Sequence, residues 1–212
     1  MRIGCGILAV FNDCASGDEA AYEDWYLNEH LPERLAIPGF RWGRRYRRYD
    51  DGPDALPEYM TYYEVDAPEV LVSRPYLDRV NDPTPQTRKI MTSVFRNMNR
   101  TICARVDGAG AIRTPWTVAV VAEGGAALSL AELPARTSDM LWREAWQDRV
   151  PADHEMSREE QIRGGDARIS ECLVIDQPSE EAALLFCEAI SGDGHKVAAF
   201  RLTGSLRAED LE

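Results

Sequence analysis

A histidine with neighbouring carboxylates lies in residues 25–34, which read WYLNEHLPER. The imidazole of His30 can titrate near neutral pH, which suits a general acid or base. Glu29 is the adjacent carboxylate. These residue types predict proton transfer or anion binding at this segment. In the alternative interpretation, His30 only packs and hydrogen-bonds the Asn28 carbonyl, which Pro32 leaves without an N–H partner.

The helix that carries this segment is predicted over residues 18–31, and Pro32 is expected to end or kink it. Four-residue spacing gives this helix one polar and aromatic face, made by Tyr22, Tyr26 and His30, with Trp25 and Glu29 beside it. The neighbouring apolar stripe, expected to meet the sheet, consists of Ala20, Leu27 and Leu31. His30 is therefore expected at the border between buried and exposed surface.

The next predicted strand, residues 40–49, carries arginines on both faces. Alternation places Arg41, Gly43, Arg45 and Arg47 on one face, and Trp42, Arg44, Tyr46 and Arg48 on the other. Because one face must pack on helices or on another sheet, some of the guanidinium groups are expected to be buried. A buried guanidinium needs a carboxylate or a ligand anion as its partner.

The strand predicted over residues 58–65 is rich in aromatic side chains. Its two faces are Tyr59, Thr61 and Tyr63, and Met60, Tyr62 and Glu64. An aromatic strand of this kind is typical of a plain core, with the alternative that Tyr62 or Tyr63 lines a ligand cavity. Arg100, on the strand predicted over residues 97–106, is a further candidate for ligand binding, and an ion pair is its alternative role.

Apolar periodicity and turn residues predict the same order of elements twice. The first part has strands over residues 3–11, 40–49, 58–65 and 97–106, and helices over 18–31, 67–80 and 86–94. The second part has strands over 117–122, 139–147, 169–176 and 197–202, and helices over 127–133, 155–163 and 179–190. We therefore predict an α+β protein of two tandem ferredoxin-like βαββαβ repeats. The repeats are residues 1–108 and a degenerate copy at 116–212, joined by a linker at 109–115.

Each repeat is expected to form a four-stranded antiparallel sheet with helices on one face only. The bare face must be buried, and a second sheet can cover it. The two sheets can meet within one chain, as a pseudo-dimer of the dimeric α/β-barrel type, or between two chains, as a homodimer.

Composition excludes several classes of function. The net charge of −12 disfavours nucleic acid and anionic lipid. No apolar run is long enough to span a bilayer, and the N-terminus has no signal-peptide pattern, so we expect a cytoplasmic protein without a membrane partner. Five cysteines with no CxxC pair argue against a disulfide framework. His154 and His195 lack ligand-like spacing to His30, so neither a metal nor a cofactor is expected.

The first 105 or so residues resemble the EthD-like family of the dimeric α/β-barrel superfamily. The resemblance lies in Trp25-Tyr26, residues 29–33 (EHLPE), residues 38–40 (PGF), Arg44-Arg45-Tyr46 and the tyrosine-rich strand at 58–64. The second half has no matching motif. The superfamily includes cyclases, lactone isomerases, dehydratases, haem-degrading monooxygenases and proteins without known activity, so fold analogy alone does not choose among these activities.

The residues and the resemblance together predict a small-molecule enzyme that performs cofactor-independent acid/base chemistry of the isomerase, cyclase or lyase type. His30 would move the proton, oriented by Tyr26 and Glu29. The resemblance implies that Arg45 is the clamp for developing negative charge, with an ion pair to Asp24, Glu29 or Glu33 as its alternative role. Trp25 and Tyr62 would form walls of the substrate pocket, and Arg100 would bind substrate. Two alternatives are a non-catalytic binder of an amphipathic anion and, by superfamily analogy, a monooxygenase with haem on His30.

Overall fold

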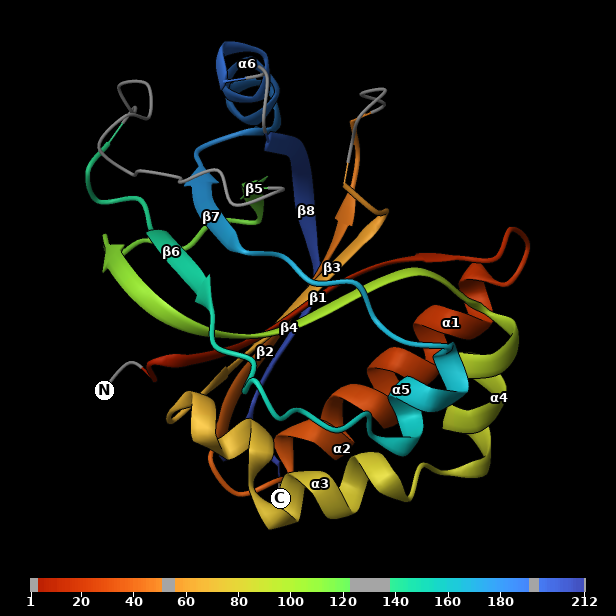
Figure 1. Ribbon diagram of the computed structural model, residues 1–212. Coiled ribbons are helices and arrows are strands. Elements are labelled where there is room, and N and C mark those ends of the chain that lie inside the picture. The colour runs from red at the N-terminus through yellow and green to blue at the C-terminus, as the bar shows by residue number, and fades with distance from the viewer. Residues whose placement is uncertain (1–3, 51–55, 123–137, 191–194, 212) are drawn as a thin grey trace.

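The computed structural model describes residues 4–50, 56–122, 138–190 and 195–211. Within these residues eight strands form a closed antiparallel barrel in the order β1-β3-β2-β8-β5-β7-β6-β4, and β4 pairs with β1 (Figure 1). The strands are β1 (Gly6–Cys14), β2 (Phe40–Arg48), β3 (Tyr59–Val65), β4 (Phe95–Ala109), β5 (Trp116–Ala122), β6 (Arg143–Asp148), β7 (Glu171–Gln177) and β8 (His195–Arg207). The predicted mixed α+β class is confirmed, and the barrel closes within one chain.

The same strand order occurs in both halves of the chain. It is β4-β1-β3-β2 in the first half and β8-β5-β7-β6 in the second. The halves join where β2 pairs with β8 and where β4 pairs with β6. The helix expected at 127–133 lies outside the described residues.

The helices lie outside the barrel in two unequal groups. They are α1 (Glu19–Trp25), the π-helix η1 (Tyr26–His30), α2 (Leu31–Leu35), the 3-10 helix η2 (Pro68–Val72), α3 (Arg74–Asn81), α4 (Pro85–Ser93), α5 (Arg158–Arg163), α6 (Glu180–Ile190) and the 3-10 helix η4 (Ala208–Asp210). In Figure 1, α1 to α5 gather on one side and α6 lies apart, against the strands of the second half. Helix α5 is encoded in the second half but packs with α3 and α4. None of the described helices could span a membrane.

The helix that carries the histidine continues past Pro32. A wider π-helical turn, η1, precedes the proline, and the N–H of Leu31 donates to the carbonyl of Tyr26. Pro32 then occupies the first turn of α2, where its missing N–H is not needed, and the helix ends at Leu35. The π-turn therefore absorbs the kink that the sequence predicts, and it keeps Arg34 on the helix.

The expected apolar stripe on this helix was partly wrong. Ala20 is exposed and Leu27 is 38% exposed, whereas the aromatic face is buried. Tyr22, Trp25 and Tyr26 remove more apolar surface from water than the two aliphatic residues could, so this face packs on the sheet. His30 is consequently buried rather than at the border of the exposed surface.

Strand alternation is confirmed for β2 and β3. Tyr46, Met60 and Tyr62 belong to the core inside the barrel, together with Phe11, Trp146 and Phe200. Tyr59 and Tyr63 belong to the core between the barrel and the helices. Arg44 and Arg45 are both buried, one on each face of β2, as the alternating arginines predicted.

Candidate functional site

A small cavity lies between the helices and the outer face of β1, β3 and β4. Its volume of about 20 Å³ is enough for a water molecule. Its apolar and aromatic wall consists of Leu8, Val10, Tyr26, Tyr63, Tyr76, Met91, Phe95 and Met98. Its charged or titratable lining consists of His30, Arg34, Arg100, Glu159 and Arg163. The sequence-predicted site residues His30, Tyr26 and Arg100 therefore share one cavity with the alternative candidate Tyr63.

His30 is held between aromatic rings at the end of the π-turn. Its ring centroid lies 4.5 Å from that of Trp25 and 5.1 Å from that of Tyr26. The side chain is buried, and its Nδ1 has no hydrogen-bond partner within the described residues. Burial, followed by the positive charges of Arg34 and Arg163, holds the pKa of His30 well below its usual value. The imidazole is therefore neutral at neutral pH, and its Nδ1 is buried without a hydrogen-bond partner among the described residues.

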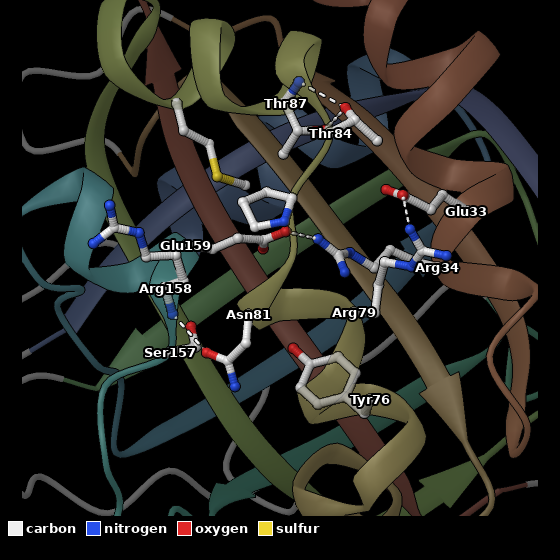
Figure 2. Close-up of polar contacts among 12 residues, drawn as sticks. Glu33, Arg34, Tyr76, Arg79, Asn81, Thr84, Thr87, Ser157, Arg158 and Glu159 are labelled. Atoms are coloured by element: carbon white, nitrogen blue, oxygen red, sulfur yellow. Dashed lines mark hydrogen bonds and ion pairs between the residues drawn. The ribbon is translucent and has the colours of Figure 1, made fainter.

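Arg34 enters the cavity from α2 and pairs with Glu159 from α5 (Figure 2). Both side chains are buried. Burial alone would lower the pKa of Arg34, but the Glu159 carboxylate raises it overall. Arg163 lies 3.9 Å from the second carboxylate oxygen of Glu159 and 2.5 Å from Asp166. Glu159 thus lies between two arginines.

Arg100 has a different environment. Its guanidinium donates to the hydroxyl of Tyr76, and no carboxylate in the described part of the chain pairs with it. Two carboxylates, Glu159 and Asp166, face the three cavity arginines. The local balance is therefore one positive charge in excess, which favours an anion in or beside the cavity.

Arg45 does not line this cavity. It is fully buried and pairs with Glu23 through two nitrogens, each at 3.0 Å, and its Nη1 donates to Thr61. Its ion-pair partner is therefore Glu23 and not Asp24, Glu29 or Glu33. The structure does not bring Arg45 and His30 to a shared hollow.

Glu29 and Trp25 lie behind the cavity. Glu29 accepts hydrogen bonds from Thr84, at 2.5 Å, and from Thr87, at 3.3 Å. Thr87 also accepts the indole N–H of Trp25, at 3.3 Å. Figure 2 shows the two threonines bonded to each other at the start of α4. Through Thr87, Glu29 therefore holds the Trp25 ring that lies against His30. Among the described residues, no hydrogen bond joins Glu29 to the imidazole.

Tyr62 lies inside the barrel and does not border the His30 cavity. Its ring stacks on Tyr46 with a centroid distance of 5.9 Å and meets Trp146 at 4.9 Å. Its hydroxyl accepts a hydrogen bond from Arg113. Tyr63, the other candidate on β3, does line the cavity, and its hydroxyl donates to that of Tyr26 at 3.3 Å.

Sequence reasoning missed Arg34, Tyr76, Glu159 and Arg163. Arg34 follows His30 by four residues, a spacing that would have placed both on one helix face had Pro32 not been read as the break. Glu159 and Arg163 are also four residues apart, on the helix predicted at 155–163. No local signal could place that helix beside residue 34, because the contact spans 125 residues.

Two larger hollows lie elsewhere and include none of the predicted site residues. One, of about 340 Å³, lies beside η2 and the middle of β4, at Ile102 and Ala104. The other, of about 350 Å³, lies at one mouth of the barrel, where Phe11, Val121 and Ile169 border it. Neither contains a histidine among its described lining residues.

The residues at His30 do not fit a haem. His30 is only 7% exposed, lies against the Trp25 ring with the two ring planes tilted by 30°, and borders a space of about 20 Å³, far less than a porphyrin needs. Among the described residues, no group of three or more histidine, cysteine, aspartate or glutamate side chains could hold a metal ion.

No family model and no curated protein matches this sequence. Among solved structures, the chain is similar to an anthrone oxidase-like protein, with 8% identity, a TM-score of 0.56, and coverage of 100% of this chain and 96% of the other. It is also similar to a Fusobacterium nucleatum subsp. nucleatum protein whose name calls it a monooxygenase. That match has 9% identity, a TM-score of 0.47, and coverage of 97% and 96%. At such low identity the first likeness supports the barrel fold alone.

Proposed function

We propose that this protein is a small-molecule enzyme that removes a proton from a carbonyl or aromatic compound, with His30 as the proton acceptor. One observation carries the proposal. A neutral, buried imidazole with an unpartnered Nδ1 borders the same cavity as Arg100, which has no carboxylate partner among the described residues. A base and a cation that face one space are the parts that enolate or phenolate formation requires.

The environment of His30 is suited to this reaction when the substrate supplies the missing negative charge. Burial and nearby arginines disfavour the imidazolium in the free protein. Proton transfer from a bound neutral carbon acid produces an imidazolium and an anion together, so the new anion offsets the new positive charge beside it. Arg100 would stabilise that anion, which is the role the sequence predicted for Arg45. Trp25 would hold the imidazole plane, and Tyr26 and Tyr63 would contact the substrate.

Substrate binding requires side chains to move, because the free cavity holds only about 20 Å³. Met91 and Met98 border it, and unbranched methionine side chains can repack at low cost. The short helix α5 closes another side through Glu159 and Arg163. We infer that the substrate enters as these groups withdraw.

The wider relationships predicted from the sequence are part of this proposal. The recurrence of one strand order in residues 6–109 and 116–207 supports two ferredoxin-like repeats on either side of a linker at 109–115. The quoted WY…EHLP residues support a relationship to the EthD-like family. The barrel-type fold is consistent with both.

Two other functions fit the same site. The charge excess and the closed cavity also suit a binder of an amphipathic anion that performs no reaction. The name of the anthrone oxidase-like neighbour suggests a variant of the leading proposal, in which the carbanion formed by proton removal is then oxidised by O₂.

The test is deuterium uptake from D₂O at the acidic carbon of anthrone, α-tetralone and a cyclic 1,3-diketone, followed by NMR. His30→Gln should slow enzyme-dependent exchange by at least tenfold, since general base catalysis typically contributes 10²–10⁴-fold. The matched control is His195→Gln, because His195 bonds the Ile190 carbonyl away from the cavity. A folded His30→Gln protein with unchanged exchange would refute the proposal. Binding without exchange would favour the binder, and O₂ consumption would identify the oxidase variant.

A further inference from the structure

The carboxylate of Glu159 lies between two arginines in the cavity, Arg34 and Arg163. It comes from α5 in the second half of the chain and reaches Arg34 of α2 (Figure 2). The exposed fractions of the two side chains are 6% and 3%. A carboxylate in this position closes the cavity on the side where the acidic group of a ligand would meet the guanidinium groups of Arg34 and Arg163.

The arginines are not saturated by Glu159. Arg34 bonds it through Nη2, while Nη1 is buried without a partner in the described residues. A guanidinium commonly binds a carboxylate through two parallel N–H donors, and here one is unused. Arg163 lies 3.9 Å from Glu159 and is held by Asp166 through two nitrogens, whereas Arg100 has no carboxylate partner among the described residues. The site thus offers more cationic donors than its internal carboxylate uses.

We propose that Glu159 is an internal stand-in for the acidic group of the ligand, and that the ligand is an aromatic carboxylate that displaces it. This inference rests on the proposed function and names the substrate class for the same site. The aromatic part follows from the wall, since Tyr26, Tyr63, Tyr76 and Phe95 border the cavity and suit a flat apolar ring. The acid part follows from Arg34 and its unused donor.

Helix α5 is a short, separately capped segment, and we infer that it moves as a unit. It has six residues, begins at the Ser157 cap and ends at Gly164 and Gly165, whose φ angles are +85° and +99°. A Cβ added at either glycine would meet nothing within 4 Å, so this turn is open, and the chain is next fixed where Ala167 pairs with Met98 and Arg100 on β4. Its start is fastened by the Arg158 N–H, which donates to Asn81 on α3 (Figure 2), and its end by Arg163, which bonds Met91 on α4. Withdrawal of this helix removes Glu159 and enlarges the cavity in one movement.

The test compares benzoate with benzyl alcohol, which keeps the ring and lacks the negative charge. Affinities are measured by titration calorimetry on the wild-type chain, Glu159→Gln and Glu160→Gln. Glu160 is the matched control, because it is equally buried and lies next in sequence but pairs with His154 outside the cavity. Glu159→Gln should bind benzoate about tenfold more tightly than wild type, since a charged competitor is gone. Benzyl alcohol affinity should stay within twofold, and Glu160→Gln should resemble wild type.

A second variant covers the case in which Glu159→Gln does not fold. Glu159→Asp keeps the charge but shortens the side chain, which weakens its reach to Arg34, and it should gain benzoate affinity at least threefold. The inference is overturned if folded variants at position 159 bind benzoate no better than wild type, or if benzyl alcohol gains equally. No turnover is measured, so this result is separate from the His30 test. If His30→Gln loses exchange but the variants at position 159 gain no benzoate affinity, only the carboxylate subsite is refuted. If those variants gain affinity but His30→Gln keeps exchange, only the proposed proton transfer is refuted.

Discussion

The guanidinium carbon of Arg45 lies 3.8 Å from the centre of the Tyr26 ring. The same ring contacts His30, at a centroid distance of 5.1 Å, and lines the cavity. Arg45 therefore reaches the site only through Tyr26, and its own donors are used by Glu23 and Thr61. Its position supports a role in holding the aromatic cluster rather than in binding a ligand anion.

Arg45→Met should destabilise the fold. The change removes a buried ion pair to Glu23 and cation–π contacts to Tyr22, Tyr26 and Tyr59. Because Glu23 is 26% exposed and can be hydrated, we expect a loss of about 2–3 kcal/mol in the free energy of unfolding, below the full cost of orphaning a buried charge. Arg47→Met on the same strand is the control, and its exposed pair with Glu58 should contribute less than about 1 kcal/mol. Equal losses in urea denaturation would contradict this account.

His30 should make stability depend on pH. Its pKa in the folded protein is held well below 6.5, so the native imidazole stays neutral while the unfolded chain takes up a proton as pH falls. The free energy of unfolding should therefore decrease as pH falls through about 6.5, by up to about 1.4 kcal/mol per pH unit. His30→Gln should lack this component. Urea denaturation at pH 7.5, 6.5 and 5.5 measures it, and parallel pH curves for the two proteins would refute it.

Gly43 allows the histidine helix to lie close to β2. A Cβ at this position would come within 2.5 Å of Leu31 Cδ1 and 3.3 Å of the Tyr63 ring. Gly43→Ala should therefore push α2 away and cost about 1–3 kcal/mol. Gly108→Ala is the control, since a Cβ there makes only ordinary contacts, of 3.5 Å or more. Comparable melting temperatures for the two variants would show that the close approach does not matter.

Glu144 joins the two halves of the chain inside the barrel. It is fully buried on β6, lies 2.5 Å from Arg105 of β4 and 3.5 Å from Arg113. Burial alone would raise the pKa of Glu144, but the two arginines hold it below its usual value. Glu144→Gln should cost about 3 kcal/mol near pH 7. Since the folded pKa is lowered, this contribution should be present at neutral pH and decline as pH falls below about 4.5. Glu58→Gln is the control, because its pair with Arg47 is largely exposed, and it should change the free energy of unfolding by less than about 1 kcal/mol. Urea denaturation measures both variants, and equal losses would contradict the role of Glu144.

Much of the local structure could be predicted because it depends on periodicity. The alternation of β2 and β3, the burial of arginines on both faces of β2, and the shared face of Tyr22, Tyr26 and His30 all follow from spacing along one element. The effect of Pro32 was harder to predict, because a residue without an N–H can be accommodated either by a π-turn before it or by the end of the helix. The buried aromatic face of α1 shows that large rings outweigh the smaller aliphatic stripe.

The sequence by itself determined which side chains share a face, and hence that a histidine would be surrounded by aromatic rings near a strand of arginines. Tertiary structure alone decided that Arg100, and not Arg45, lines the cavity beside that histidine. The barrel closes through β2–β8 and β4–β6 pairs, and α5 returns across 125 residues to place Glu159 on Arg34. Spacing along one helix or strand specifies only the direction in which each side chain points. A partner from a distant segment depends on how whole surfaces pack together.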